Sequence, residues 1–166
     1  MPLTTPRELF LHELADAMSA EQQILKMLPE LQEEARNSEV REALQEHEAE
    51  TRQQVENIQE VFRQFGETPE TTTCLAMQGI AAEHQALHQE EPPPEILEMA
   101  NLIGAAKTEH YEIASYAALV QMAKDLGEKD IAALLQETLT EEEAMSKRVT
   151  ALAKAAGKEL KASAAD

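Results

Sequence analysis

Aromatic residues, glycine and cysteine are scarce in this sequence, which has no Trp, two Tyr, three Phe, five Gly and one Cys. Segments in which Val, Ile, Thr and aromatic residues alternate with polar residues are missing, so the usual signal for β-strands is absent. The lone cysteine, Cys74, excludes an internal disulfide and is typical of a reducing compartment. We therefore expect a cytoplasmic protein without a β-sheet.

Positive charge and long apolar runs are also in short supply. The chain has 14 Lys and Arg against 32 Asp and Glu, which gives a net charge of −18. Such a charge attracts cations and repels nucleic acid and anionic membranes, so we expect neither as a partner. No apolar run approaches the roughly 18 residues that a membrane span needs. The sequence also opens without the basic and apolar regions of a secretory signal.

The abundant residues are Ala, Leu, Glu, Gln, Lys and Met, which lose little side-chain freedom in a helix. They form four long amphipathic segments, and the fold class that we predict is all-α. The expected helices cover residues 6–36, residues 38–65 with Ser38 as N-cap, a segment from just after Pro94 to Gly127, and a segment from near Glu128. Residues 1–156 are expected to form one domain, and residues 157–166 a frayed C-terminal tail.

The connection between the second and third long helices is much longer than the other two. It runs from Gly66 to Pro94, and residues 73–90 within it are predicted to form a shorter helix. A connection of this length can carry the chain back along the whole bundle, so the second and third long helices can run parallel. One long crossover between two helical hairpins is typical of ferritin-like four-helix bundles.

Each long segment has an apolar stripe at alternating steps of three and four residues, and an ionisable residue interrupts each stripe near its middle. In chain order the interrupting residues are Glu21, His47, Glu109 and Glu142, with Glu50 and Glu112 one turn beyond the second and the third. No Lys or Arg falls on these stripes. An unpaired buried carboxylate costs on the order of several kcal/mol, and two divalent or trivalent cations would remove that cost. The pattern therefore favours a dimetal site held by carboxylates and an imidazole.

Simpler interpretations exist for each of these residues. A glutamate-rich helix places some Glu in any chosen register, and a histidine on an apolar face is often a hydrogen-bonded core residue. Four interruptions at mid-stripe are harder to explain in this way. Outside the stripes, we interpret His84 and His88, spaced four residues apart in the crossover, as surface residues. Tyr116 could donate a hydrogen bond to the site, but we interpret it as a core residue.

Short strings around the interrupting residues resemble signatures of the YciE/YciF family of bacterial ferritin-like stress proteins. The strings are Ala20-Glu21-Gln22-Gln23, His47-Glu48-Ala49-Glu50-Thr51, Glu109-His110-Tyr111-Glu112-Ile113-Ala114-Ser115-Tyr116 and Glu137-Thr138-Leu139-Thr140-Glu141-Glu142, together with Cys74-Leu75-Ala76-Met77 in the crossover. The resemblance covers nearly the whole chain. It implies a rubrerythrin-like dimetal site, a homodimer, and the metal ligands Glu21, His47, Glu50, Glu109, Glu112 and Glu142.

Two departures from the broader ferritin pattern affect this ligand set. The second helix has His47 before Glu50, which reverses the usual Glu-x-x-His order, and the fourth helix has Met145 where a second histidine is expected. One of the two metal ions would therefore have only oxygen ligands. Glu141 could also replace Glu142 as a ligand if the helix rotates slightly.

Two functions from different classes fit these observations. The first is a dimetal oxidoreductase of the stress response that reduces O₂ or peroxide, or oxidises Fe(II). Its cofactor would be two metal ions, which we expect to be iron, with manganese or zinc as alternatives. The second is a helical interaction or structural protein of the stress response without turnover, either stabilised by metal or free of it.

Overall fold

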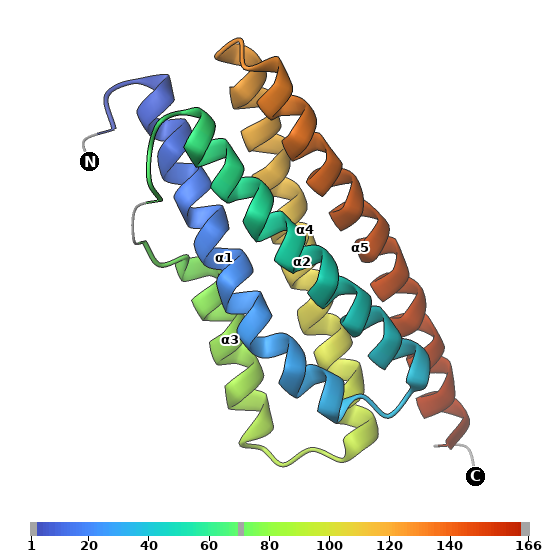
Figure 1. The fold of residues 1–166 in the computed structure, drawn as a ribbon. Helices are drawn as coiled ribbons and strands as arrows, with labels where there is room; N and C mark the ends of the chain where they lie inside the picture. The colour runs from blue at the N-terminus through green and yellow to red at the C-terminus, as the bar shows by residue number, and fades with distance from the viewer. Residues whose placement is uncertain (1–2, 70–71, 164–166) are drawn as a thin grey trace.

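A computed structural model describes residues 3–69 and 72–163 of the chain, and these residues form five helices and no strand. The helices are α1 (Pro6–Glu34), α2 (Ser38–Gln64), α3 (Leu75–His88), α4 (Pro94–Asp125) and α5 (Lys129–Ser163). The four long helices lie side by side and α3 lies outside them (Figure 1). The all-α fold class and the short helix in the crossover are confirmed. None of the helices in the described residues combines the length and the apolar composition that crossing a bilayer requires.

The long helices are arranged as two hairpins joined by the crossover. α1 packs against α2 and α4, and α5 also packs against α2 and α4. α2 and α4 therefore stand at opposite corners of the bundle, and Figure 1 shows that they run in the same direction. The parallel direction predicted for these two helices is confirmed, while every packed pair of long helices is antiparallel. α3 packs on α1 and α4, so the crossover covers one side of the bundle.

Glycines end two of the long helices where the sequence predicts it. Gly66 follows α2 with φ 69° and Gly127 follows α4 with φ 82°, a left-handed conformation that suits glycine. At the first of these ends, Gly66 N–H donates to the Arg63 carbonyl and Glu67 N–H donates to the Phe62 carbonyl. Gly127 and the residue after it repeat this pattern at the end of α4. Both helices therefore end in a Schellman motif, which satisfies their last carbonyls.

Two predicted boundaries need correction. The N-cap of α2 is Asn37, whose side chain accepts a hydrogen bond from Glu39 N–H, and Ser38 is the first helical residue. The tail expected to fray from residue 157 is helical as far as Ser163, because α5 passes through Gly157 without a break. Residues 164–166 of that tail lie outside the described residues.

Apolar side chains fill both halves of the bundle and leave a polar layer between them. One half contains Phe10, Leu14, Ile58, Phe62 and Leu135, among other buried residues. The other half contains a cluster around Leu102, Met145 and Val149 and a second cluster around Ile24, Leu28 and Met77 under the crossover. The polar layer consists of the ionisable residues that interrupt the four stripes.

Candidate metal centre

Five ionisable side chains from all four long helices are buried in the polar layer. Their exposed fractions are 5 % for the histidine and 1 % for each carboxylate, and they are Glu21 on α1, His47 on α2, Glu109 and Glu112 on α4, and Glu142 on α5. Each is on the inner face because its helix buries apolar residues of the same stripe on both sides of it. Within the described residues no Lys or Arg is buried. No buried cation of the protein therefore neutralises these carboxylates.

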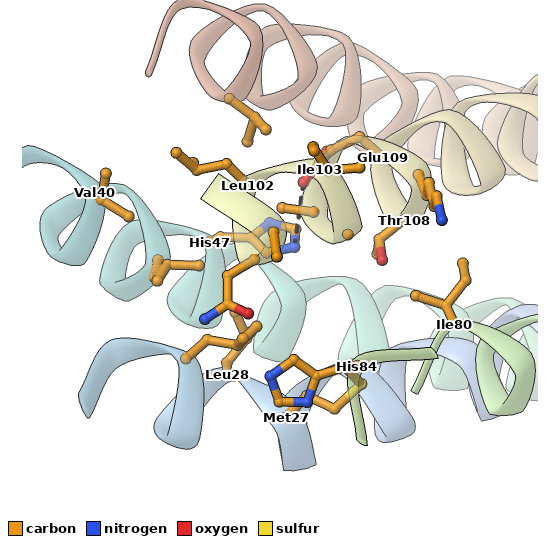
Figure 2. A pocket seen from close by; sticks show the side chains of 18 of the residues that line it. Met27, Leu28, Val40, His47, Ile80, His84, Leu102, Ile103, Thr108 and Glu109 are labelled. Atoms are coloured by element: carbon orange, nitrogen blue, oxygen red, sulfur yellow. Dashed lines mark ion pairs between the residues drawn. The ribbon is translucent and has the colours of Figure 1, made fainter. Parts of the chain in front are cut away.

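His47, Glu109 and Glu142 form the tightest group of the layer. One ligand atom from each of them lies within 4.8 Å of the others, a spacing that can hold a metal ion. His47 Nε2 is 3.6 Å from Glu109 Oε1, and Figure 2 marks this pair with a dashed line. The three residues come from three different helices, so a bound ion would connect α2, α4 and α5.

Glu112 and Glu21 continue the layer towards α1. The charges of Glu21 and Glu142 both act on the Glu112 carboxyl group and raise its pKa further above the value that burial gives it. Tyr116, fully buried one turn beyond Glu112, donates its hydroxyl hydrogen to Glu21 Oε1. The interpretation of Tyr116 as a core residue alone was therefore incomplete, because it also positions a carboxylate of the site.

Glu50 occupies the rim of the layer rather than its centre. Its side chain is half-buried, and burial together with the charges of Glu141 and Glu46 raises its pKa. It does not belong to the group of His47, Glu109 and Glu142, although its charge acts on Glu109. Of the six predicted ligands, the structure thus buries five together and places Glu50 beside them.

Gln54 is a member of this layer that the sequence analysis did not single out. It is completely buried, and its side-chain N–H₂ group donates to Glu142 Oε1 at 2.5 Å and to Glu141 Oε2 at 3.1 Å. It follows His47 by seven residues, which is two helical turns. This spacing places both residues on the same face of α2 and could have identified Gln54 from the sequence. Glu142 is buried in the centre and Glu141 is half-buried, so the choice between them falls on Glu142 as the inward residue.

Burial shifts the pKa of every ionisable member of the layer. It is the largest cause of the raised pKa values of Glu21, Glu109, Glu112 and Glu142, and neighbouring carboxylate charges raise all four further. Hydrogen bonds, including one from Gln54, act in the opposite direction on Glu142. Burial lowers the pKa of His47 to about 4, so its imidazole is neutral at pH 7. A neutral imidazole is the form that binds metal ions.

Many polar atoms of the layer have no hydrogen-bond partner within the protein. They include Glu21 Oε2, His47 Nδ1, Glu109 Oε2, Glu142 Oε2 and both carboxyl oxygens of Glu112. Native proteins leave very few buried polar atoms unpaired, and each one needs an explanation. The residues present therefore fit bound cations, which would occupy these oxygen and nitrogen lone pairs.

An apolar cavity of about 190 Å³ adjoins the centre, and its walls come from all five helices. His47 and Glu109 lie at this cavity, as Figure 2 shows, together with apolar side chains such as Leu28, Val40 and Leu102. Met145, which stands where the ferritin pattern has a second histidine, lines the same cavity. The cavity thus reaches two of the candidate ligands, His47 and Glu109.

Two helical hairpins, a crossover with an added helix and a central carboxylate–histidine layer define a ferritin-like four-helix bundle. The family model described as "Domain of unknown function (DUF892)" matches residues 5–162, and the chain belongs to this family. It is 35 % identical over 154 residues to protein YciF of Escherichia coli strain K12, with 92 % of this chain and 93 % of that protein covered.

Solved structures agree with this assignment. The crystal structure of the E. coli stress protein YciF matches with a TM-score of 0.89 and 34 % identity, over 94 % of this chain and 99 % of that one. YcfI of Rhodopseudomonas palustris, described as a candidate structural protein, matches with a TM-score of 0.86 and 36 % identity, over 89 % and 94 % of the two chains. The predicted resemblance to the YciE/YciF family is therefore confirmed.

Proposed function

We propose that this protein is a dimetal protein of the stress response that reduces O₂ or peroxide, or oxidises Fe(II). The two ions are iron in this proposal, with manganese or zinc as alternatives. The observation that carries it is the set of buried carboxylate and imidazole atoms without a protein partner. The proposal includes a cytoplasmic location, for which the lone Cys74 is the argument, and a homodimer, which the family resemblance implies.

The ligands would be His47, Glu109 and Glu142 together with Glu21 and Glu112, with Glu50 at the rim. Iron at such a site supplies redox chemistry towards oxygen species. The protein's own contribution is to hold the carboxylates in place: Tyr116 donates to Glu21, and Gln54 donates to Glu142. Such outer partners orient metal ligands in general. The apolar cavity beside His47 and Glu109 would offer a place for O₂ next to the centre.

A second candidate is a metal-stabilised structural protein without turnover. It is favoured by YcfI, which is described as a candidate structural protein and which this chain resembles at a TM-score of 0.86. In this case the metal would serve only to neutralise the buried carboxylates. Metal binding alone cannot separate the two functions, because both require it.

The test is to purify the protein without oxygen, measure its metal content, and then add Fe(II) in air while following the near-UV absorbance. We expect two iron ions per chain and oxidation faster than that of Fe(II) in buffer. Glu21→Ala and His47→Ala should lower both readings, whereas Gln22→Ala, an exposed neighbour of Glu21, should leave them unchanged. Bound metal without oxidation would favour the structural protein. No difference among the variants would contradict the dimetal centre itself.

A further inference from the structure

A second group of metal-ligating side chains lies far from the polar layer, where the end of α1 meets the end of α3. Glu30, Glu34 and His88 each place one ligand atom within 4.8 Å of the others. His88 Nε2 is 2.8 Å from Glu34 Oε1, and His84 Nε2 is 3.4 Å from Glu34 Oε2. Both imidazoles thus meet the two oxygens of a single carboxylate from another helix.

Glu34 and the neighbouring His84 are largely shielded from water, whereas Glu30 and His88 are exposed. The side chains of Glu34 and His84 are only 12 % and 13 % exposed. Both salt bridges of Glu34 within the described residues are to imidazoles, so no Lys or Arg neutralises it there. Asn101 donates its side-chain N–H₂ group to Glu34 Oε2 at 2.6 Å, and its own buried Oδ1 has no partner.

The donor set is one that divalent transition metals prefer. Two histidines four residues apart lie on the same face of a helix, which is a common arrangement for zinc ligands. Ligand atoms of a tetrahedral zinc ion with bonds of about 2.0 Å are ~3.3 Å apart, and the N–O distances to Glu34 are 2.8 Å from His88 and 3.4 Å from His84. The two carboxylates would balance the charge of one divalent ion.

We propose that Glu30, Glu34 and His88 form a second metal site, for a divalent transition-metal ion such as Zn²⁺, with His84 beside it at Glu34 Oε2. The bound ion would fasten the crossover helix to the bundle. The ion would add to the existing attachment of the helix, which includes the buried Met77 near its start, the half-buried Ile80 and an exposed ion pair between Glu83 and Lys107. Asn101 orients Glu34 from α4. The same helix contributes Met77, Ile80 and His84 to the wall of the apolar cavity, so the ion would also fix that wall.

The test compares two double variants of the full chain in Zn²⁺ titrations of metal-free protein by calorimetry. His84→Gln with His88→Gln keeps the size and a hydrogen-bond donor at both positions but removes the imidazoles. We expect this variant to bind one Zn²⁺ fewer per chain than the parent. The control, His12→Gln with His110→Gln, changes two exposed histidines outside the group and should bind as the parent does.

A second measurement keeps the result independent of the central site. In the parent, Zn²⁺ should shift the NMR signals of the His84 and His88 rings, and it should do so equally in His47→Ala, which lacks the central imidazole. Circular dichroism checks that each variant keeps its helices. If the His84 and His88 variant binds as many Zn²⁺ ions as the parent, or if Zn²⁺ leaves the two rings unshifted, the second site does not exist. If the parent binds no metal at the central site but Zn²⁺ still shifts the His84 and His88 rings, the proposed function is contradicted and the second metal site stands.

Discussion

Two adjacent glutamates of α5 show how sharply the environment changes from one residue to the next. Glu142 is 1 % exposed in the polar layer, and Glu143 is exposed on the outer face. Successive residues of a helix point about 100° apart, which accounts for the difference. Glu142 has a raised pKa because it is buried, whereas Glu143 projects into water.

Replacing Glu142 by Gln should change metal binding and metal-free stability in opposite directions. The variant Glu142→Gln removes a ligand, so it should bind less metal. It also removes a buried acid, so the metal-free protein should gain on the order of 1–3 kcal/mol at neutral pH. Metal analysis and urea denaturation measure the two effects, and Glu143→Gln is the control that should alter neither. A metal-free Glu142→Gln protein less stable than the parent would contradict the assigned environment.

The two tyrosines of the chain allow a matched test of ligand positioning. Tyr116 donates to Glu21 in the polar layer, whereas Tyr111 donates to Asp16 at 2.6 Å and contacts Cys74 Sγ at 3.0 Å. Tyr116→Phe should weaken metal binding roughly 10–100-fold, because it removes the group that orients a ligand. Tyr111→Phe removes an equal hydroxyl and should leave the metal affinity unchanged. Competition with a coloured chelator measures both, and equal affinities would rule out the positioning role of Tyr116.

At the scale of the elements, Glu98 connects α4 to the turn between α1 and α2. Its side chain is 8 % exposed and accepts hydrogen bonds from the backbone N–H groups of Arg36 at 2.6 Å and Asn37 at 2.8 Å. Glu95, one turn earlier, makes an exposed ion pair with Arg36 at 3.3 Å. The two residues therefore differ in burial and in the kind of group that they bind.

Glu98→Ala should destabilise the protein by about 1.5–3 kcal/mol, since it leaves two backbone donors without a charged acceptor. Glu95→Ala should cost less than about 1 kcal/mol, as exposed ion pairs contribute little. Urea denaturation followed by circular dichroism gives both values, and the slope of the transition should stay constant. Equal losses from the two variants would show that Glu98 does not hold the turn.

The elements were predictable where local chemistry decides them. Gly66 and Gly127 end their helices because each adopts a left-handed conformation. On α5 the steps of three and four around Glu142 predict a buried stripe, and all its members are buried: Ile131, Leu135, Thr138, Glu142, Met145, Val149 and Leu152. On α1 the same steps lead from Glu21 to Leu25, which is only half-buried, whereas its neighbour Ile24 is buried. Alternating steps of three and four average 3.5 residues, and a straight helix of 3.6 residues per turn drifts away from that repeat.

At the scale of the whole molecule, the sequence predicted the layer but not the contacts within it. One ionisable residue near the middle of each stripe was enough to predict that Glu21, His47, Glu109 and Glu142 lie at the same height along the bundle axis. Contacts across the bundle depend on how each helix is rotated, which no single stripe reveals. For this reason the position of Glu50 at the rim and the role of Gln54 became visible only in the structure.

The layer also gives the metal-free protein an unusual dependence on pH. The pKa values of four buried carboxyl groups are raised above their ordinary value of 4.5, because burial disfavours the charged form. A raised pKa adds stability that is fully present below pH 4.5 and is lost as the pH rises through the folded-state value. His47 opposes this, because its pKa is lowered to about 4 and its contribution is lost as the pH falls below its ordinary value of 6.5. The contributions of the four carboxyl groups to stability together outweigh that of the single imidazole, so the net stability falls as the pH rises towards neutral.

The metal-free protein should therefore melt at a higher temperature at pH 5.5 than at pH 7.5, contrary to the usual effect of acid. The metal-loaded protein should show the opposite trend, because protons compete with metal ions for the same oxygen atoms. At pH 7.5 chelation should lower the melting temperature, since an ion bound only by the folded state stabilises it. Calorimetric scans with and without chelator at both pH values measure all three effects.

Glu112→Gln combined with Glu142→Gln should flatten the dependence of the metal-free melting temperature on pH. Glu56→Gln combined with Glu143→Gln, which changes two exposed residues, should preserve it. A metal-free parent that melts lower at pH 5.5 would mean that these carboxyl groups are not buried together as the structure places them.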